Sequence, residues 1–288
     1  MDQPQDGQLE PPSLLLLPYE LRAKIYEELI SSETPPPQDP AQASERSREP
    51  LHSISAFYPK EFRHPCSSLM RTSKGIHDEV KALLDAESRQ QKPKCKLDLL
   101  VVRKGVYPTW TMPPRARSAE AFDLDVDLRL LDLTDPNPLF MANAWPGIVS
   151  QPLMVILNRL VAYGPQFSRP LPNFEGLRIH NLTMHVRYCA SKRVAPRKAR
   201  QERRSTPEYV FGSLSHFMEM LEAQGVLYGK VTEMRLVCDR LGESRAVSIY
   251  PPVHPTEDGQ RSSEYWDQNG YAWGPDPNAY RADRYEHY

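Results

Sequence analysis

Several features that would assign the chain to a class of protein are scarce in the sequence. Lys and Arg number 36 against 37 Asp and Glu, a formal net charge of −1, so no excess charge attracts nucleic acid or a membrane surface. The four cysteines (Cys66, Cys95, Cys189 and Cys238) form no C-x-x-C pair, which indicates reduced thiols in a cytoplasmic or nuclear protein. No apolar run approaches the about 20 residues of a membrane span, and Leu14–Leu17 is too short for a signal peptide.

Catalytic and metal-binding motifs are also missing. There are only 13 glycines, and neither a phosphate-binding glycine loop nor a G-x-S-x-G nucleophile motif occurs. Asp123, Asp125 and Asp127 lack the glycine and glutamate of an EF-hand loop, so they predict a solvated strand face. Histidines and cysteines show no metal-ligand spacing. We expect no catalysis, no metal and no cofactor, with an enzyme that lacks a recognisable motif as the alternative.

Proline, in contrast, is abundant, with 29 of 288 residues, about twice the usual share. Thirteen of these prolines lie in three segments: residues 1–13, the insert 31–50 and the tail 251–288. These segments have few apolar residues to bury or show no periodicity, so we expect them to be disordered around a folded centre.

The sharpest pattern lies in residues 14–30, LLLLPYELRAKIYEELI. Pro18 suits the first position of a helix, and Ser31 and the prolines 35–37 end it. Apolar residues recur along it every four positions: Leu21, Ile25 and Leu29, with Tyr26 and Ile30 beside them. A helix of about a dozen residues is marginal alone in water, so this stripe must be covered. Either the chain's own core or a partner protein covers it.

A second helical block, SSLMRTSKGIHDEVKALL, occupies residues 67–84, with a break or kink expected near Ser73–Gly75. In their motifs and the order of these motifs, the two blocks together resemble the F-box-like domain common in filamentous fungi, here covering residues 14–88. The resemblance implies a helical module that docks onto a Skp-type adaptor of a cullin–RING ubiquitin ligase and recruits an unknown protein substrate. The residues that it implies for docking are Leu17, Pro18, Leu21, Ile25, Tyr26, Leu29, Leu69, Ile76 and Val80.

Beyond residue 94 the period changes from helical to two, most clearly in residues 122–130, where apolar residues alternate with Asp and Arg. The solvated aspartate face is typical of antiparallel sheets. We therefore predict an α+β domain over residues 94–250, with a mainly antiparallel sheet and helices packed on one side. The expected strands are 94–102, 106–112 (demoted to an edge by Pro108), 122–130, 182–188, 231–238 and 246–250, and the expected helices are 151–163 and 207–224.

A basic run, KRVAPRKARQERR, occupies residues 192–204. Its cations are Lys192, Arg193, Arg197, Lys198, Arg200, Arg203 and Arg204. Such a run is typical of a nuclear-import signal, a phosphate-binding strip or a solvated loop, and no aromatic residues interleave to stack on bases. The alternative to the adaptor hypothesis is a stand-alone nuclear or nucleic-acid-associated interaction protein that uses this run and has no ligase role.

Overall fold

The computed structural model describes residues 14–43, 45–50, 55–60, 66–90, 94–102, 105–114, 121–131, 150–165, 167, 177–189, 207–224 and 227–249. The segments 1–13 and 251–288, predicted to be disordered, and the basic run 192–204 lie outside these residues. The chain divides into two compact units. The helical unit comprises Met1–Ser32 and Arg63–Gln91, and the sheet unit comprises Glu33–Phe62 and Lys92–Tyr288.

The helical unit contains the two blocks predicted to be helical. A short 3-10 turn, η1 (Leu14–Leu16), precedes α1 (Tyr19–Ser31), and α2 (Cys66–Met70) is followed by α3 (Lys74–Gln90). Pro18 is the N-cap of α1 rather than its first helical residue, because its ψ of 147° is extended. The break between α2 and α3 falls where the sequence predicts it, and the Ser73 hydroxyl accepts a hydrogen bond from the Ile76 amide at the start of α3 (3.2 Å).

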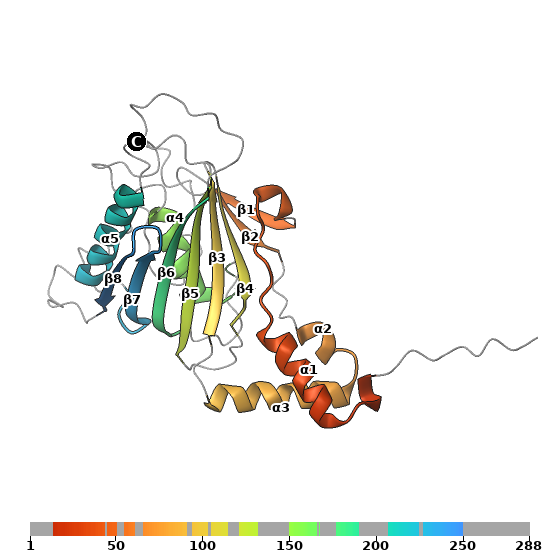
Figure 1. Ribbon diagram of the computed structural model, residues 1–288. Helices are drawn as coiled ribbons and strands as arrows, with labels where there is room; N and C mark the ends of the chain where they lie inside the picture. Colours follow the sequence, from red (N-terminus) through yellow and green to blue (C-terminus); the bar gives the residue numbers. More distant parts are fainter. Residues whose placement is uncertain are drawn as a thin grey trace, which may run out of the picture. The chain divides into compact units, whose positions relative to one another are not determined.

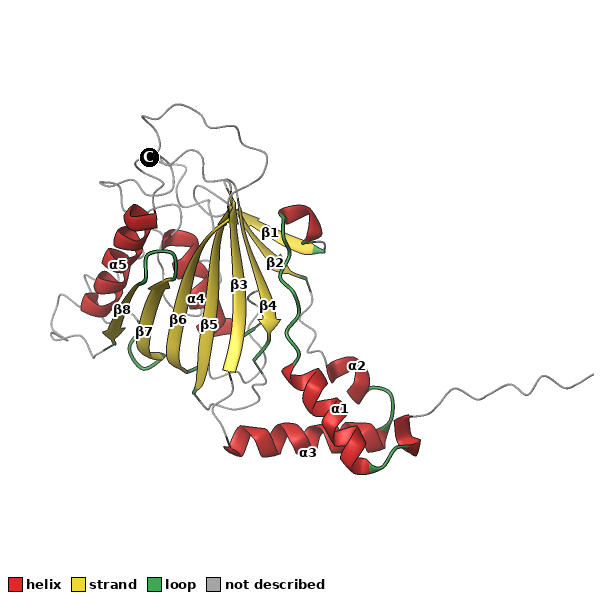
Figure 2. Cartoon of the chain, in the orientation of Figure 1, coloured by secondary structure: helices red, strands yellow, loops and turns green. Residues whose placement is uncertain are grey.

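The sheet unit is built on one eight-stranded sheet, in the order β1-β2-β4-β3-β5-β6-β7-β8 (Figures 1 and 2). Its strands are β1 (Arg46–Pro50), β2 (Ser55–Pro59), β3 (Lys94–Val102), β4 (Gly105–Met112), β5 (Phe122–Leu131), β6 (Ile179–Cys189), β7 (Val231–Cys238) and β8 (Glu243–Ser248). Its helices are the turn η2 (Pro40–Gln42), α4 (Ser150–Tyr163) and α5 (Pro207–Gln224).

Helical crossovers determine the strand directions in the centre of the sheet. Helix α4 connects β5 to β6 and α5 connects β6 to β7, and both strand pairs are parallel, as such crossovers require. Pairs β3–β5 and β2–β4 are also parallel, whereas β1–β2, β3–β4 and β7–β8 are antiparallel. The predicted α+β class is confirmed. The sheet, predicted to be mainly antiparallel, is mixed, with three antiparallel and four parallel pairs among its described strands.

The chain before β3 differs most from the expectations. The proline-rich insert 31–50 contains η2 and β1, and residues 33–50 belong to the sheet unit rather than to the helical one.

Strand β4, predicted to be an edge strand, is not an edge, since β2 pairs with it at Gly105 and Val106. Pro108 is tolerated there because it lies beyond this short pairing, and its carbonyl accepts a hydrogen bond from Arg46 Nη1 (2.6 Å).

One face of the sheet packs against α4 and α5 (Figure 1). Leu97, Leu124, Met184 and Leu236 lie on this face, at alternate positions of four neighbouring strands, and are at most 1% exposed. They share one apolar cluster with both helices. The alternating apolar residues that predicted these strands therefore lie on the face that two helices cover. Burial of this cluster is the main contribution to the stability of the unit.

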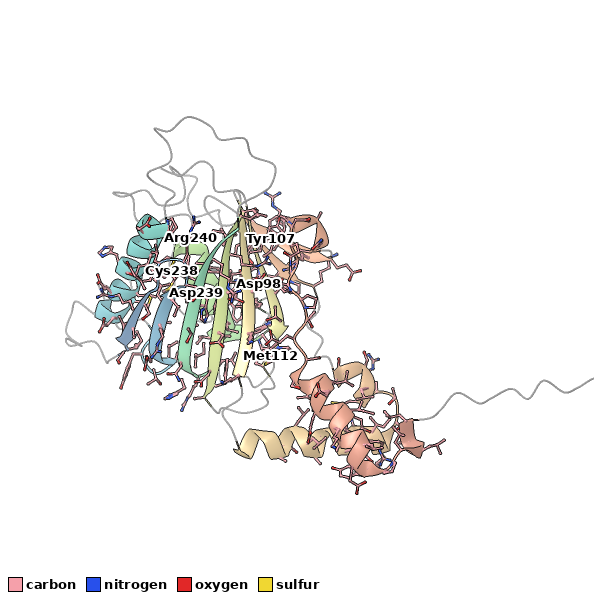
Figure 3. All side chains as sticks on the ribbon, viewed as in Figure 1. Asp98, Tyr107, Met112, Cys238, Asp239 and Arg240 are labelled. Carbon is pink, nitrogen blue, oxygen red and sulfur yellow. The ribbon has the colours of Figure 1, made fainter. Side chains whose placement is uncertain are left out.

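The opposite face of the sheet is polar, and the three predicted aspartates lie there, half-buried. Asp127 pairs with Arg187 on β6 (3.0 Å). Asp98 on β3, labelled in Figure 3, is only 1% exposed and receives hydrogen bonds from Arg129 Nε and Nη2, the latter at 2.8 Å. Arg129 Nη2 also donates to the Pro37 carbonyl (2.6 Å), and the Thr34 amide donates to the Thr111 carbonyl (2.8 Å). The predicted disordered insert is thus held across this face by the buried ion pair and by backbone bonding.

Replacing Asp98 with alanine removes this carboxylate from the buried Arg129 guanidinium. We expect the free energy of unfolding to fall by about 3–5 kcal/mol, because an uncompensated buried charge is costly. The matched control is Asp127→Ala, at the aligned position of β5, whose partner Arg187 is half-exposed; we expect about 0–1 kcal/mol there. Urea unfolding followed by circular dichroism measures both losses. Equal losses would contradict the special role given to the buried pair.

Candidate docking surface

Helix α1 exposes an apolar row formed by Leu21, Ile25 and Leu29, spaced four residues apart. Their exposed fractions are 48%, 37% and 41%. The chain before α1 adds Leu15, Leu16 and Leu17, of which Leu16 is 81% exposed, and the first helical residue adds Tyr19. Of the eight large apolar side chains exposed in the described part of the chain, these are seven; the eighth is Tyr228. Such a concentration on one short segment is typical of a surface that binds another protein.

The other side of α1 closes the core of the helical unit. Tyr26 and Ile30 are 0% and 3% exposed and pack with Cys66, Ile76 and Val80. Partly buried apolar side chains surround this cluster: Leu14, Leu69, Met70, Leu83 and Leu84. The small core therefore fixes which side of α1 faces outward.

The structure separates the nine residues that the resemblance implied for docking into two groups. Leu17, Pro18, Leu21, Ile25 and Leu29 are exposed. Tyr26, Ile76 and Val80 are buried in the unit's own core, and Leu69 is partly buried against it. This second group supports the surface from beneath, and its three buried members, Tyr26, Ile76 and Val80, are not accessible to a partner, because their apolar atoms already fill the interior.

Polar contacts fasten α1 to α3 at the border between the core and the exposed row. Glu79 on α3 accepts hydrogen bonds from Arg22 Nη2 (2.5 Å), Arg22 Nε (3.0 Å) and the Tyr26 hydroxyl (2.9 Å). The hydrogen bonds and charge of Arg22 hold the pKa of Glu79 below its ordinary value. Burial raises the pKa of Tyr26, and its bond to Glu79 acts in the same direction. A two-pronged Arg–carboxylate pair of this kind fixes orientation as well as distance.

The sequence patterns do not mark Arg22, Glu79, Leu15, Leu16 or Tyr19 as functional residues. A signal for two of them was present, since Arg22 lies in the LPYELR motif and Glu79 in the IHDEV motif of the blocks that carry the resemblance. The contact between them was not evident, because 57 residues separate them along the chain.

The other candidate sites have less support among the described residues. The basic run, Lys192, Arg193, Arg197, Lys198, Arg200, Arg203 and Arg204, lies outside the described residues. Within the described ranges, no group of three or more His, Cys, Asp or Glu side chains is placed to hold a metal ion. No helix among the same residues is long and apolar enough to cross a membrane.

Comparisons of the chain with protein-family models, with curated proteins and with solved structures found no match.

The depressed pKa of Glu79 predicts a pH dependence of stability. The ordinary carboxyl value is 4.5, and the folded value lies below it, so the contribution of Glu79 is fully present above about pH 4.5 and is lost as the pH falls through the folded pKa. We expect Glu79→Gln to lack this part of the acid destabilisation. The measurement is urea unfolding of both proteins between about pH 3 and pH 7.

The control for this experiment is Glu28→Gln, which removes an exposed carboxylate from α1. It should keep the acid destabilisation of the wild type. An identical pH profile for Glu79→Gln and the wild type would contradict the role given to the Arg22–Glu79 contact.

Proposed function

We propose that the helical unit is an F-box-like docking module that binds a Skp-type adaptor of a cullin–RING ubiquitin ligase. The observation that carries the proposal is the exposed apolar row Leu21, Ile25 and Leu29 of α1, whose opposite side is already filled by the unit's own core. The two sequence blocks that resemble the F-box-like pattern are the two parts of the chain that build this unit. Binding by a helix whose apolar side chains enter a groove is an established mode of protein recognition.

The energetics favour a partner of this kind. Each large aliphatic side chain removed from water contributes about 1.5–3 kcal/mol to the free energy of binding. Three such side chains on one face of a helix therefore favour association with an apolar partner surface. The row projects from a helix fastened to α3 by the Arg22–Glu79 pair, so little conformational freedom is lost when a partner covers it.

Under this proposal the chain performs no chemistry itself and acts by proximity. The helical unit provides attachment to the ligase, and the sheet unit presents a protein substrate. The stand-alone alternative relies on residues 192–204, which lie outside the described part of the chain, and no feature described above favours it.

The double variant Leu21→Asp/Ile25→Asp tests the proposal. Placing two carboxylates where the apolar partner surface packs should weaken adaptor binding at least about a hundredfold, because each charge would be buried without a partner. The full-length chain, tagged, is used to capture purified Skp-type adaptor, and the dissociation constant is measured by titration calorimetry. Circular dichroism checks that both variants remain folded.

The matched control is Tyr228→Asp, which places the same charge at an exposed apolar residue of the sheet unit and should leave adaptor binding unchanged. If the wild type binds no Skp-type adaptor and the double variant captures the same proteins from a cell lysate as the wild type, the ligase role is wrong. Nucleic-acid binding that weakens steeply with salt and is lost when residues 192–204 are neutralised would instead support the stand-alone alternative.

A further inference from the structure

The Arg22 side chain forms hydrogen bonds both with α3 and with the segment before α1. Its Nε and Nη2 donate to Glu79 on α3, and its Nη1 donates to the carbonyl of Leu17 (2.5 Å), with the carbonyl of Leu15 at 3.5 Å. The Tyr19 ring lies 5.9 Å from the Arg22 guanidinium carbon, within cation–π range. One side chain therefore contacts α3, the Tyr19 ring at the start of α1 and two carbonyls of the segment that leads into α1.

The leucine run, residues 14–17, has little else to hold it. Leu15 and Leu16 are 50% and 81% exposed, so only Leu14 packs against the core of the unit. The turn contains one backbone hydrogen bond, from the Leu17 amide to the Leu14 carbonyl (3.2 Å). A single 3-10 turn of this kind has poor hydrogen-bond geometry and is not stable by itself. Its order depends on contacts from outside the turn.

We propose that Arg22 is a positioning residue that joins the leucine run to the apolar row, so that Leu15–Leu17 and Leu21, Ile25, Leu29 form one docking surface. Glu79 acts through Arg22 by fixing the orientation of its guanidinium. The proposal rests on the proposed function for the identity of the partner, a Skp-type adaptor. The ordering of the leucine run by Arg22 is a property of the free chain and is tested separately.

The planar guanidinium is what allows this double role. Arg22 presents donors on two edges of one rigid group, so it satisfies the Glu79 carboxylate with one edge and the Leu17 carbonyl with the other. A lysine ammonium at the same position is a compact point charge on a flexible stem and does not reproduce the fork. A purely structural ion pair would require only the contact with Glu79.

A charge swap separates the two roles. In Arg22→Glu/Glu79→Arg the ion pair between α1 and α3 is re-formed, but residue 22 has no donor for the Leu17 carbonyl. We expect the swap to regain stability relative to Arg22→Glu alone while the leucine run stays disordered. Lys24→Glu makes the same charge change as Arg22→Glu, at an exposed position of α1, and is the matched control for the first half of the swap.

Two readouts are taken on the full-length chain. Backbone ¹⁵N relaxation gives the order parameters of Leu15, Leu16 and Leu17; we expect about 0.85 in the wild type and in Lys24→Glu, and below about 0.6 in Arg22→Lys and in the swap. Titration with purified Skp-type adaptor should show binding about tenfold weaker in Arg22→Lys and the swap, since the run must then be ordered during binding.

The outcomes distinguish the two proposals. Unchanged order parameters in the swap overturn the positioning role, whatever the adaptor does. Lost order with full adaptor affinity overturns the extension of the docking surface to the leucine run. If the wild type binds no adaptor while the order parameters change as expected, the proposed function fails and the positioning role of Arg22 is supported.

Discussion

The packing of Tyr26 and Ile30 against Cys66, Ile76 and Val80 decides what the rest of the helical unit does. These five side chains make the buried core of the unit, and they hold α1 by one side only. Because successive helical residues are rotated by about 100°, fixing Tyr26 and Ile30 inward turns Ile25 and Leu29 toward the solvent. The exposed row is thus a consequence of the core.

In the sheet unit, two helices cover one face of the sheet, and ion pairs lie on the other face. Burial under α4 and α5 accounts for the alternating apolar residues of the central strands. On the opposite face, the buried Asp98–Arg129 pair ties the chain after α1 to the sheet through the Pro37 carbonyl. The segment that follows α1 is therefore a bound part of the sheet unit from Glu33 onward.

The sequence predicted the periodic elements closely, since β3, α5 and β7 have the predicted bounds, and it missed the elements whose order comes from distant partners. Strand β1, RSREP, has no apolar periodicity; it is ordered by pairing with β2 and by Arg46, which reaches the Pro108 carbonyl. The parallel pairing of the central strands was not evident either, because alternation reports which face is buried and says nothing about strand direction.

For the candidate surface, the sequence of α1 does not tell which side of the helix is exposed. Helix α1 carries two adjacent apolar stripes: Leu21, Ile25 and Leu29, and, one residue later, Tyr26 and Ile30. Together they span roughly half of the helix circumference, more than the about 100° that packing on a single core uses. The stripes are chemically alike, so the pattern does not tell which one is covered by the chain. The core made with Cys66, Ile76 and Val80 takes the second stripe, and the bonds of Glu79 to Arg22 and Tyr26, at the border between the stripes, support this orientation. A helix with one more apolar stripe than its own fold can bury is suited to contact a second protein, and this excess is the physical basis of the adaptor proposal.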